Sequence, residues 1–89
     1  VFDVSEAKTV VAVHVVLMDE TGALQNLLKI IARYNVSIVT ITQSAPVDGT
    51  AAVSITMKVK DMVGDVDSLV EEMKRRSFVV TAKRIMQDI

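Results

Sequence analysis

The chain has 89 residues, of which 51% are hydrophobic, 3% aromatic and 24% charged, and ten Lys and Arg stand against eleven Asp and Glu. High hydrophobicity with a net charge of −1 excludes an intrinsically disordered chain and gives no electrostatic reason to expect nucleic acid or an acidic membrane surface as a partner. The absence of cysteine excludes disulfides, a thiol nucleophile and a thiolate metal site.

A chain this short removes only roughly 60–65% of its unfolded surface from water, so its apolar residues exceed what one core needs. We therefore expect a second molecule to cover the remainder. The longest apolar stretch, Val10–Met18, is far shorter than the about 20 residues of a membrane-spanning helix. We expect a cytoplasmic protein with no membrane partner, in which residues 1–8 lead in from a missing N-terminal segment and residues 9–89 form one domain.

The first predicted element is a strand over residues 9–18, where β-branched side chains dominate. Both alternating rows of this strand are apolar, which is typical of a strand that is buried on two faces. One row consists of Val11, Val13, Val15 and Leu17, and the other includes Val10, Ala12, Val16 and Met18.

A polar segment, Asp19-Glu20-Thr21-Gly22, ends this strand, and aliphatic residues at helical spacing then predict an amphipathic helix through Tyr34. Asp19 or Thr21 is expected to cap the start of the helix, and Asn35 to adopt the left-handed conformation that ends it. The aliphatic residues at helical spacing are Leu24, Leu27, Leu28 and Ile31.

A second β-branched run predicts a strand over residues 36–44, followed by a hairpin loop with the turn signals Pro46 and Asp48-Gly49. In the strand that follows, odd residues from Ala51 to Val59 are apolar and most even residues are polar. We expect the odd row to face the helices.

Gly64-Asp65 opens a second predicted helix, in which Glu71 and Glu72 point outward. Lys74-Arg75-Arg76 lies at its C-terminal end, where the helix dipole favours cations. A solvated helix end explains this basic run, and an anion site is the alternative. A last strand is predicted over residues 77–86. The inward residues of the helix are Val66, Leu69, Val70 and Met73.

The predicted order is β-α-β-β-α-β, which indicates an α+β ferredoxin-like fold with a four-stranded antiparallel sheet and both helices on one face. No helix covers the opposite face, and the first strand is apolar there as well. We therefore expect a partner molecule or domain on that face.

Several activities that this fold hosts lack the residues they need. RNA recognition requires exposed aromatic residues on the central strands, a soft-metal carrier requires cysteines, and phosphate cleavage requires a cationic first loop. No second group is fixed near the single histidine, His14, so we interpret it as packed or hydrogen-bonded rather than catalytic. We predict no catalytic residue, metal site or cofactor. The aromatic residues, all outside the first and third strands, are Phe2, Tyr34 and Phe78.

The loop before the first helix suits a free amino acid. Unpaired amides and a partial positive charge at a helix N-terminus bind a carboxylate, Gly22 allows close approach, and Asp19 can pair with an ammonium group. The alternative is that Gly22 only permits a tight turn and Asp19 only caps the helix. The residues alone leave both interpretations open.

Two segments carry a resemblance to a known family. The segment from Val11 to Leu28, with its Asp19-Glu20-Thr21-Gly22 loop, resembles the opening strand, D-x-x-G loop and helix of ACT domains, the regulatory modules that sense amino acids. The Thr42-Gln43-Ser44-Ala45-Pro46-Val47-Asp48-Gly49 hairpin and the Ala52-Val53-Ser54-Ile55 segment are similar to the bacterial ACT proteins linked to phenylalanine biosynthesis and called chorismate-mutase-like.

The resemblance implies a ligand site where two ACT domains pair, with contacts from Asp19, Glu20, Thr21 and Gly22 and from Ser37 in the second strand. Thr21 stands where ACT domains often have proline, and Ser37 where they often have asparagine. The subgroup also implies a helix-turn-helix-like segment before Val1, so that this chain is the sensor half of a DNA-binding regulator and does not itself contact nucleic acid.

Three functions are therefore considered. The first is a homodimeric or higher-oligomeric amino-acid sensor, pairing through its sheet and binding phenylalanine or another small hydrophobic amino acid. The second is a chorismate mutase, whose dianionic substrate needs converging cations that we do not expect from the arginines. The third is a ligand-free dimerisation module. The arginines outside the first loop are Arg33, Arg75, Arg76 and Arg84.

Overall fold

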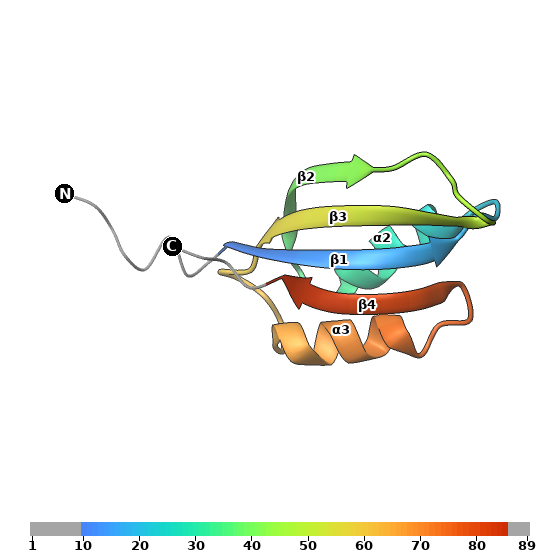
Figure 1. Ribbon diagram of the computed structural model, residues 1–89. Coiled ribbons are helices and arrows are strands. Elements are labelled where there is room, and N and C mark those ends of the chain that lie inside the picture. The colour runs from blue at the N-terminus through green and yellow to red at the C-terminus, as the bar shows by residue number, and fades with distance from the viewer. Residues whose placement is uncertain (1–9, 86–89) are drawn as a thin grey trace.

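The computed structural model describes residues 10–85 and has the predicted order of elements (Figure 1). The expected lead-in at residues 1–8 and the end of the last predicted strand at Met86 lie outside the described residues. The elements are β1 (Val10–Met18), α2 (Ala23–Arg33), β2 (Ser37–Gln43), β3 (Thr50–Lys58), α3 (Val66–Lys74) and β4 (Val79–Ile85).

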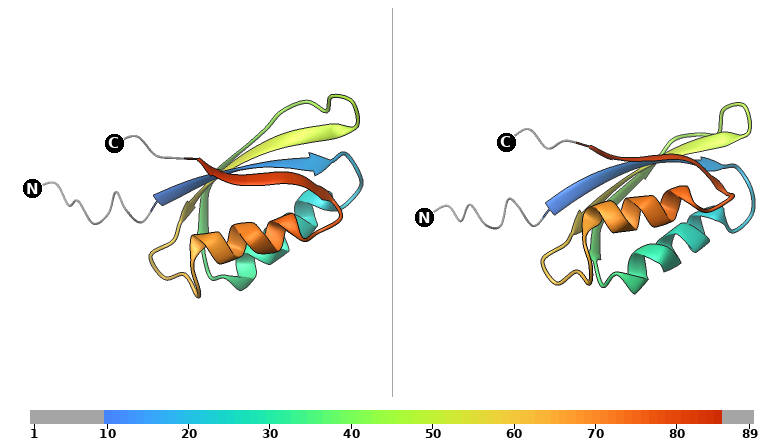
Figure 2. Two further views of the ribbon diagram at one scale, coloured as in Figure 1. Left: turned by 60° about the horizontal axis from the view of Figure 1, so that its bottom comes forward. Right: turned by 90° about the horizontal axis from the view of Figure 1, so that it is seen from below.

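The four strands form one sheet in the order β2-β3-β1-β4, and every neighbouring pair is antiparallel. Both helices lie on the same face of this sheet, and the other face is left uncovered (Figure 2). The prediction of an α+β ferredoxin-like fold is confirmed.

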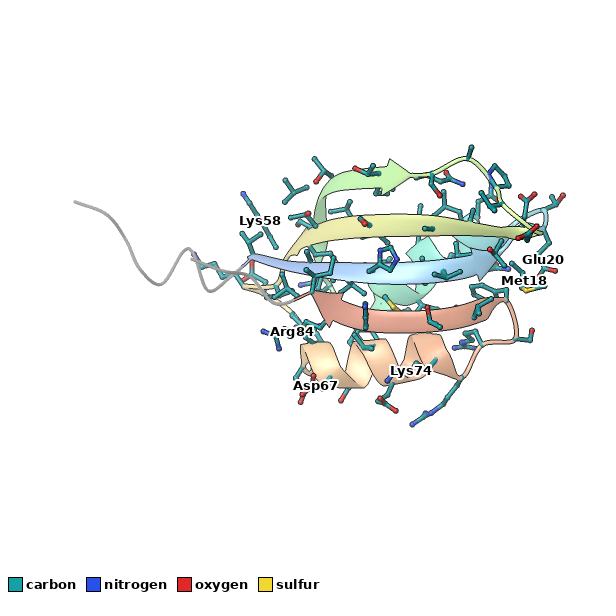
Figure 3. The ribbon with its side chains drawn as sticks, in the orientation of Figure 1. Met18, Glu20, Lys58, Asp67, Lys74 and Arg84 are labelled. Atoms are coloured by element: carbon teal, nitrogen blue, oxygen red, sulfur yellow. The ribbon has the colours of Figure 1, made fainter. Side chains whose placement is uncertain are left out.

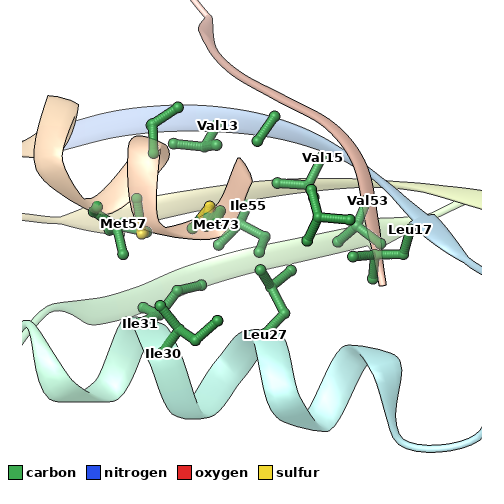
Figure 4. Close-up of a cluster of buried hydrophobic side chains, with 14 of the residues drawn as sticks. Val13, Val15, Leu17, Leu27, Ile30, Ile31, Val53, Ile55, Met57 and Met73 are labelled. Carbon is green, nitrogen blue, oxygen red and sulfur yellow. The ribbon is translucent and has the colours of Figure 1, made fainter. Parts of the chain in front are cut away.

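The core forms where the odd rows of β1 and β3 meet the helices (Figure 4). Because successive side chains of a strand point to opposite faces, the apolar odd residues reach one side only, and that side is covered by α2 and α3. The prediction that the odd row of β3 faces the helices is confirmed. The fully buried large side chains are Val13, Val15, Leu27, Ile31, Val53, Ile55, Met57, Leu69 and Met73.

The outer row of β1 faces away from the helices. Ala12 is buried, His14 and Val16 are half-buried, and Met18 is 40% exposed, so the expected open face is present but largely shielded by its neighbours. Across β1 on this face, most neighbours on the adjacent strands are hydroxyl or lysine side chains, but Ala52 of β3 lies beside Val16 and Ile85 of β4 lies beside Ala12. The polar neighbours are Thr50, Ser54, Thr56 and Lys58 of β3 and Thr81 and Lys83 of β4.

Two predicted turns have the backbone that their residues favour. Asp48 and Gly49 have φ values of 53° and 78°. The amide of Val47 donates to the carbonyl of Thr50 at 2.8 Å, and the amide of Thr50 donates to the carbonyl of Val47 at 3.0 Å. Positive φ at both central residues defines the type I′ turn of a tight hairpin. Asn35 has φ 56°, which confirms the left-handed residue after α2.

The strand β2 lies at an edge of the sheet, and all seven of its residues are exposed. Ile38 and Ile41 pair with Met57 and Ile55, so they share the face on which the helices lie. Each is nevertheless 38% exposed, because α2 does not extend over this edge.

The start of α3 is capped by the side chain of Asp65. The carboxylate Oδ1 of Asp65 accepts a hydrogen bond of 2.8 Å from the backbone amide of Ser68. This bond favours the ionised carboxylate and lowers the pKa of Asp65.

Candidate functional site

The loop between β1 and α2 is built on one left-handed glycine. Gly22 has φ 85° and ψ −4°, and the amide of Ala23 donates to the carbonyl of Glu20 at 3.2 Å. These values are those of a type II turn over residues 20–23, with the glycine at the position that requires positive φ. Thr21 occupies the second position of this turn, where proline is favoured.

The expectation that Asp19 or Thr21 caps α2 is wrong. Gly22 itself occupies the cap position, and no side chain caps the helix. A capping side chain needs an extended backbone at that position, and the left-handed turn excludes it. The carboxylate of Asp19 is therefore not engaged at the helix start.

The loop is fixed to the end of the sheet by its own backbone. The amide of Asp19 donates to the carbonyl of Gly49 in the β2–β3 hairpin at 2.8 Å, and the amide of Glu20 donates to the carbonyl of Met18 at 2.9 Å. Met18 and Glu20 mark this end of the sheet in Figure 3. Asp19, Glu20 and Thr21 are thus exposed but stand on an anchored backbone.

The first turn of α2 is open to an anion. The helix has no acidic residue in its first turn and no side-chain cap, so its leading amides and partial positive charge are not neutralised from within the described residues. A Cβ placed on Gly22 would meet no atom within 4 Å. Glycine is needed here for its backbone conformation, and the space in front of it is free.

The structure does not bring Ser37 to this loop within one chain. Ser37 pairs with Lys58, which in turn pairs with Val10 at the start of β1, whereas the loop follows the end of β1. Figure 3 shows Lys58 and Glu20 at opposite ends of the sheet. The nine residues of β1 separate the two sites by about 26 Å.

His14 lies on the open sheet face and is hydrogen-bonded. Its Nδ1 lies 3.3 Å from the Oγ of Ser54, its neighbour on β3, and Lys83 is its neighbour on β4. Neither neighbour is a carboxylate that could orient the ring as a general base. The interpretation of His14 as a hydrogen-bonded residue of the sheet face is confirmed.

A cluster of charges joins the two helices at Glu72. The Glu72 carboxylate accepts hydrogen bonds from the Tyr34 hydroxyl and from Arg76, each at 2.8 Å, and also from Arg33. Its side chain is only 21% exposed, so the expectation that Glu72 points outward is wrong. Residues 33 and 76 do converge, contrary to expectation, although they converge on a carboxylate of the chain itself.

The hydrogen bond from Tyr34 is the main cause of the shifts in this cluster. It stabilises the ionised carboxylate and, together with the bond from Arg76, lowers the pKa of Glu72. The same bond raises the pKa of Tyr34, because the hydroxyl must keep its proton to donate.

A pocket of about 300 Å³ lies beside this cluster, between α2 and the segment that joins α3 to β4. Sequence reasoning missed it, although its α2 residues recur at helical spacing and therefore share one flank of the helix. It does not include the loop residues 19–22 or Ser37. The pocket is lined by Asn26, Lys29, Ile30, Arg33, Arg76 and Phe78.

Residues 10–85 hold no cluster of three or more His, Cys, Asp or Glu side chains that could bind a metal ion. Neither helix of this part of the chain is long and apolar enough to cross a membrane.

Comparison with known proteins identifies one family. The ACT domain family model matches residues 6–84. Curated relatives named UPF0735 ACT domain-containing proteins include one from Lysinibacillus sphaericus, 33% identical over 76 residues, and one from Caldicellulosiruptor saccharolyticus, 36% identical over 74 residues. A third, from Clostridium botulinum strain Hall, is 36% identical over 90 residues.

The matches cover 85%, 83% and 99% of this chain but only 48%, 49% and 62% of those relatives, so the chain spans about half to three fifths of their length. Their names do not refer to the chorismate-mutase-like subgroup, which the second resemblance had indicated. Among solved structures, the ACT domain from GTP pyrophosphokinase of Chlorobium tepidum superposes with a TM-score of 0.65 at 20% identity, covering 85% of this chain and 96% of that one.

The type II turn predicts that Thr21→Pro stabilises the chain. Proline pre-sets the backbone that this position needs and reduces the freedom of the unfolded chain, which is worth about 0.4–1 kcal/mol. Urea unfolding of wild type and variant measures the change. A loss of stability would contradict the turn assignment.

The cluster at Glu72 predicts that the free energy of unfolding depends on pH in the acidic range. Because its folded pKa is lowered, the contribution of the Glu72 carboxylate is present above the ordinary glutamate value of 4.5 and is lost as the pH falls through the folded pKa. The free energy of unfolding of wild type should exceed that of Glu72→Gln at pH 7, and the difference should shrink below pH 4.5. Glu71→Gln serves as the matched control, because Glu71 accepts no hydrogen bond from Tyr34. An equal pH dependence in both variants would contradict the assignment.

Proposed function

This chain belongs to the ACT domain family, and we propose that it is a sensor that binds a small hydrophobic amino acid where two copies of the domain pair. The observation that carries the proposal is the uncapped start of α2 behind Gly22, with free space in front of it. ACT domains are in general regulatory, ligand-binding modules, which agrees with a site of this kind.

The loop can recognise the two charges of a free amino acid. The carboxylate of the ligand would accept hydrogen bonds from the amides of Leu24 and Gln25 in the first turn of α2, which have no acceptor within the helix. The exposed carboxylate of Asp19, which does not cap the helix, would pair with the ammonium group. Glu20 and Thr21 border the same space.

Apolar side chains beside this loop favour a hydrophobic ligand. Leu24 and Leu28 are only partly buried and lie on the flank of α2 opposite Asn26 and Arg33, which face the α3 side. That flank is directed toward β2, where Ile41 is exposed. A side chain of phenylalanine or leucine size would be taken out of water between them.

The same apolar flank supports pairing through β2. The strand carries no charge and no proline, has its outer hydrogen-bonding groups unpaired at the sheet edge, and exposes Ile38, Val39 and Ile41. The other edge strand, β4, carries Lys83 and Arg84, which discourage pairing. An edge-to-edge dimer through β2 would extend the sheet across both copies.

Antiparallel pairing of β2 would also complete the site. Two copies of the strand run in opposite directions about a two-fold axis, so that the start of one lies beside the end of the other. Ser37 of the partner subunit would then move to the end of the sheet that carries the Gly22 loop. The site would therefore form only in the dimer, with Ser37 supplied by the second copy.

The enzyme alternative lacks supporting geometry. Arg33 and Arg76 converge on one carboxylate, Glu72, and nothing in the lining of their pocket distinguishes a chorismate site from a site for any other anion. A ligand-free dimerisation module remains the alternative that the experiments below distinguish.

Calorimetric titration of the chain with each of the twenty amino acids tests the sensor. We expect saturable binding of a hydrophobic amino acid and about tenfold weaker binding by Gly22→Asn, because asparagine tolerates positive φ but places a side chain in the free space. Leucine at this position would be strained by φ 85° and would confuse binding with folding.

The matched control is Gly64→Asn, at a left-handed glycine of φ 83° that precedes α3 at the other end of the sheet. It should share the strain and retain binding. Absence of binding by every amino acid to dimeric wild-type protein would leave the ligand-free module as the function, and turnover of chorismate to prephenate would establish the enzyme.

Sedimentation equilibrium tests the interface. Ile41→Glu places a charge on the exposed β2 flank and should convert a dimer to a folded monomer, because residue 41 contributes little to the core of one chain. Val16→Glu, on the open sheet face, should leave the dimer intact. The reverse result would indicate that two sheets pair face to face.

A further inference from the structure

We propose that the pocket between α2 and the α3–β4 segment is a second ligand site, which binds the phosphate group of a small organic phosphate. The pocket, of about 300 Å³, lies at the lower end of the size range of small-molecule sites. It is distinct from the Gly22 loop, and the inference does not rest on the amino-acid sensor.

Three cations from two parts of the chain line this pocket. Lys29 and Arg33 come from one flank of α2, and Arg76 follows the end of α3. No carboxylate is among the lining residues. A chain with an overall net charge of −1 therefore gathers positive charge at one place.

Glu72 holds the two arginines in position without neutralising the pocket. One nitrogen of Arg33 and one of Arg76 bond to the same carboxylate oxygen, Oε2, while Oε1 is taken by the Tyr34 hydroxyl. A guanidinium group has five N–H donors, so each arginine keeps others free. With Lys29, the cluster carries three positive charges against one negative charge.

This arrangement suits phosphate chemistry. A phosphate monoester carries nearly two negative charges, and arginine forks match its oxygen atoms while lysine adds a point charge. A carboxylate behind the arginines restricts their rotamers in advance, which lowers the entropy lost when an anion binds.

The remaining lining residues favour an organic ligand over inorganic phosphate. Phe78, which is half-buried, provides apolar surface next to the cations, and Asn26 provides an amide that can donate or accept. A compound that joins a phosphate to a ring or short apolar group would contact both parts. The sequence allowed the basic run at residues 74–76 to be either a solvated helix end or an anion site. In this proposal one of its residues, Arg76, contributes to an anion site.

NMR titration of the ¹⁵N-labelled chain at constant ionic strength tests this proposal, with inorganic phosphate and adenosine 5′-monophosphate as probes. We expect saturating shifts at Lys29, Arg33 and Phe78, tighter binding of the nucleotide, and unchanged signals in the Gly22 loop. Lys29→Gln and Arg76→Gln should each weaken binding about five- to tenfold. Phe78→Leu should weaken the nucleotide and leave inorganic phosphate unaffected.

Lys58→Gln, at the far end of β3, is the matched control and should bind both probes as wild type does. The proposal is overturned if the shifts do not saturate, if Lys58→Gln weakens binding as much as Lys29→Gln, or if malonate binds as tightly as phosphate. Circular dichroism melting of each variant separates loss of binding from loss of folding. If Arg76→Gln lowers the melting temperature while wild-type protein binds neither probe, the arginines serve only to hold the two helices together.

Discussion

One-sided burial of the central strands determines most of this structure. The odd rows of β1 and β3 are buried against two helices that lie on the same face of the sheet, and most of the apolar surface that folding removes from water is removed there. The exposure of the surfaces that the helices do not cover follows from this arrangement. The outer row of β1 is shielded only by its neighbours, and β2 keeps every residue in contact with solvent.

The elements that could be predicted are those determined by neighbours in sequence. Alternation of apolar residues in the third strand, helical spacing in both helices, and the Asp48-Gly49 turn each report a local preference, and the structure has all of them. The cap of α2 was wrong because two local rules competed. A left-handed glycine at residue 22 and a side-chain cap require different backbones, and the glycine prevailed.

The charged cluster could not be predicted as a whole, since it joins two segments that are distant in sequence, although Glu72 and Arg76 are a local i,i+4 pair. Arg33 and Glu72 are 39 residues apart, and Tyr34 and Glu72 are 38 apart. Only the packing of α2 against α3 brings them together. The candidate loop was found because its residues are consecutive, whereas Ser37 lies at the other end of the sheet, a separation that depends on strand order and not on spacing.

The central position of β1 has a consequence for folding during synthesis. This strand pairs with β4, the last element of the described chain, so the middle of the sheet joins residues near both ends of the sequence. Contacts of such long sequence separation form late and slow folding, because the intervening loop must close first. During synthesis, β1 cannot pair with β4 until residues 79–85 have left the ribosome. Until then this edge of the valine-rich strand is open to pairing with other chains.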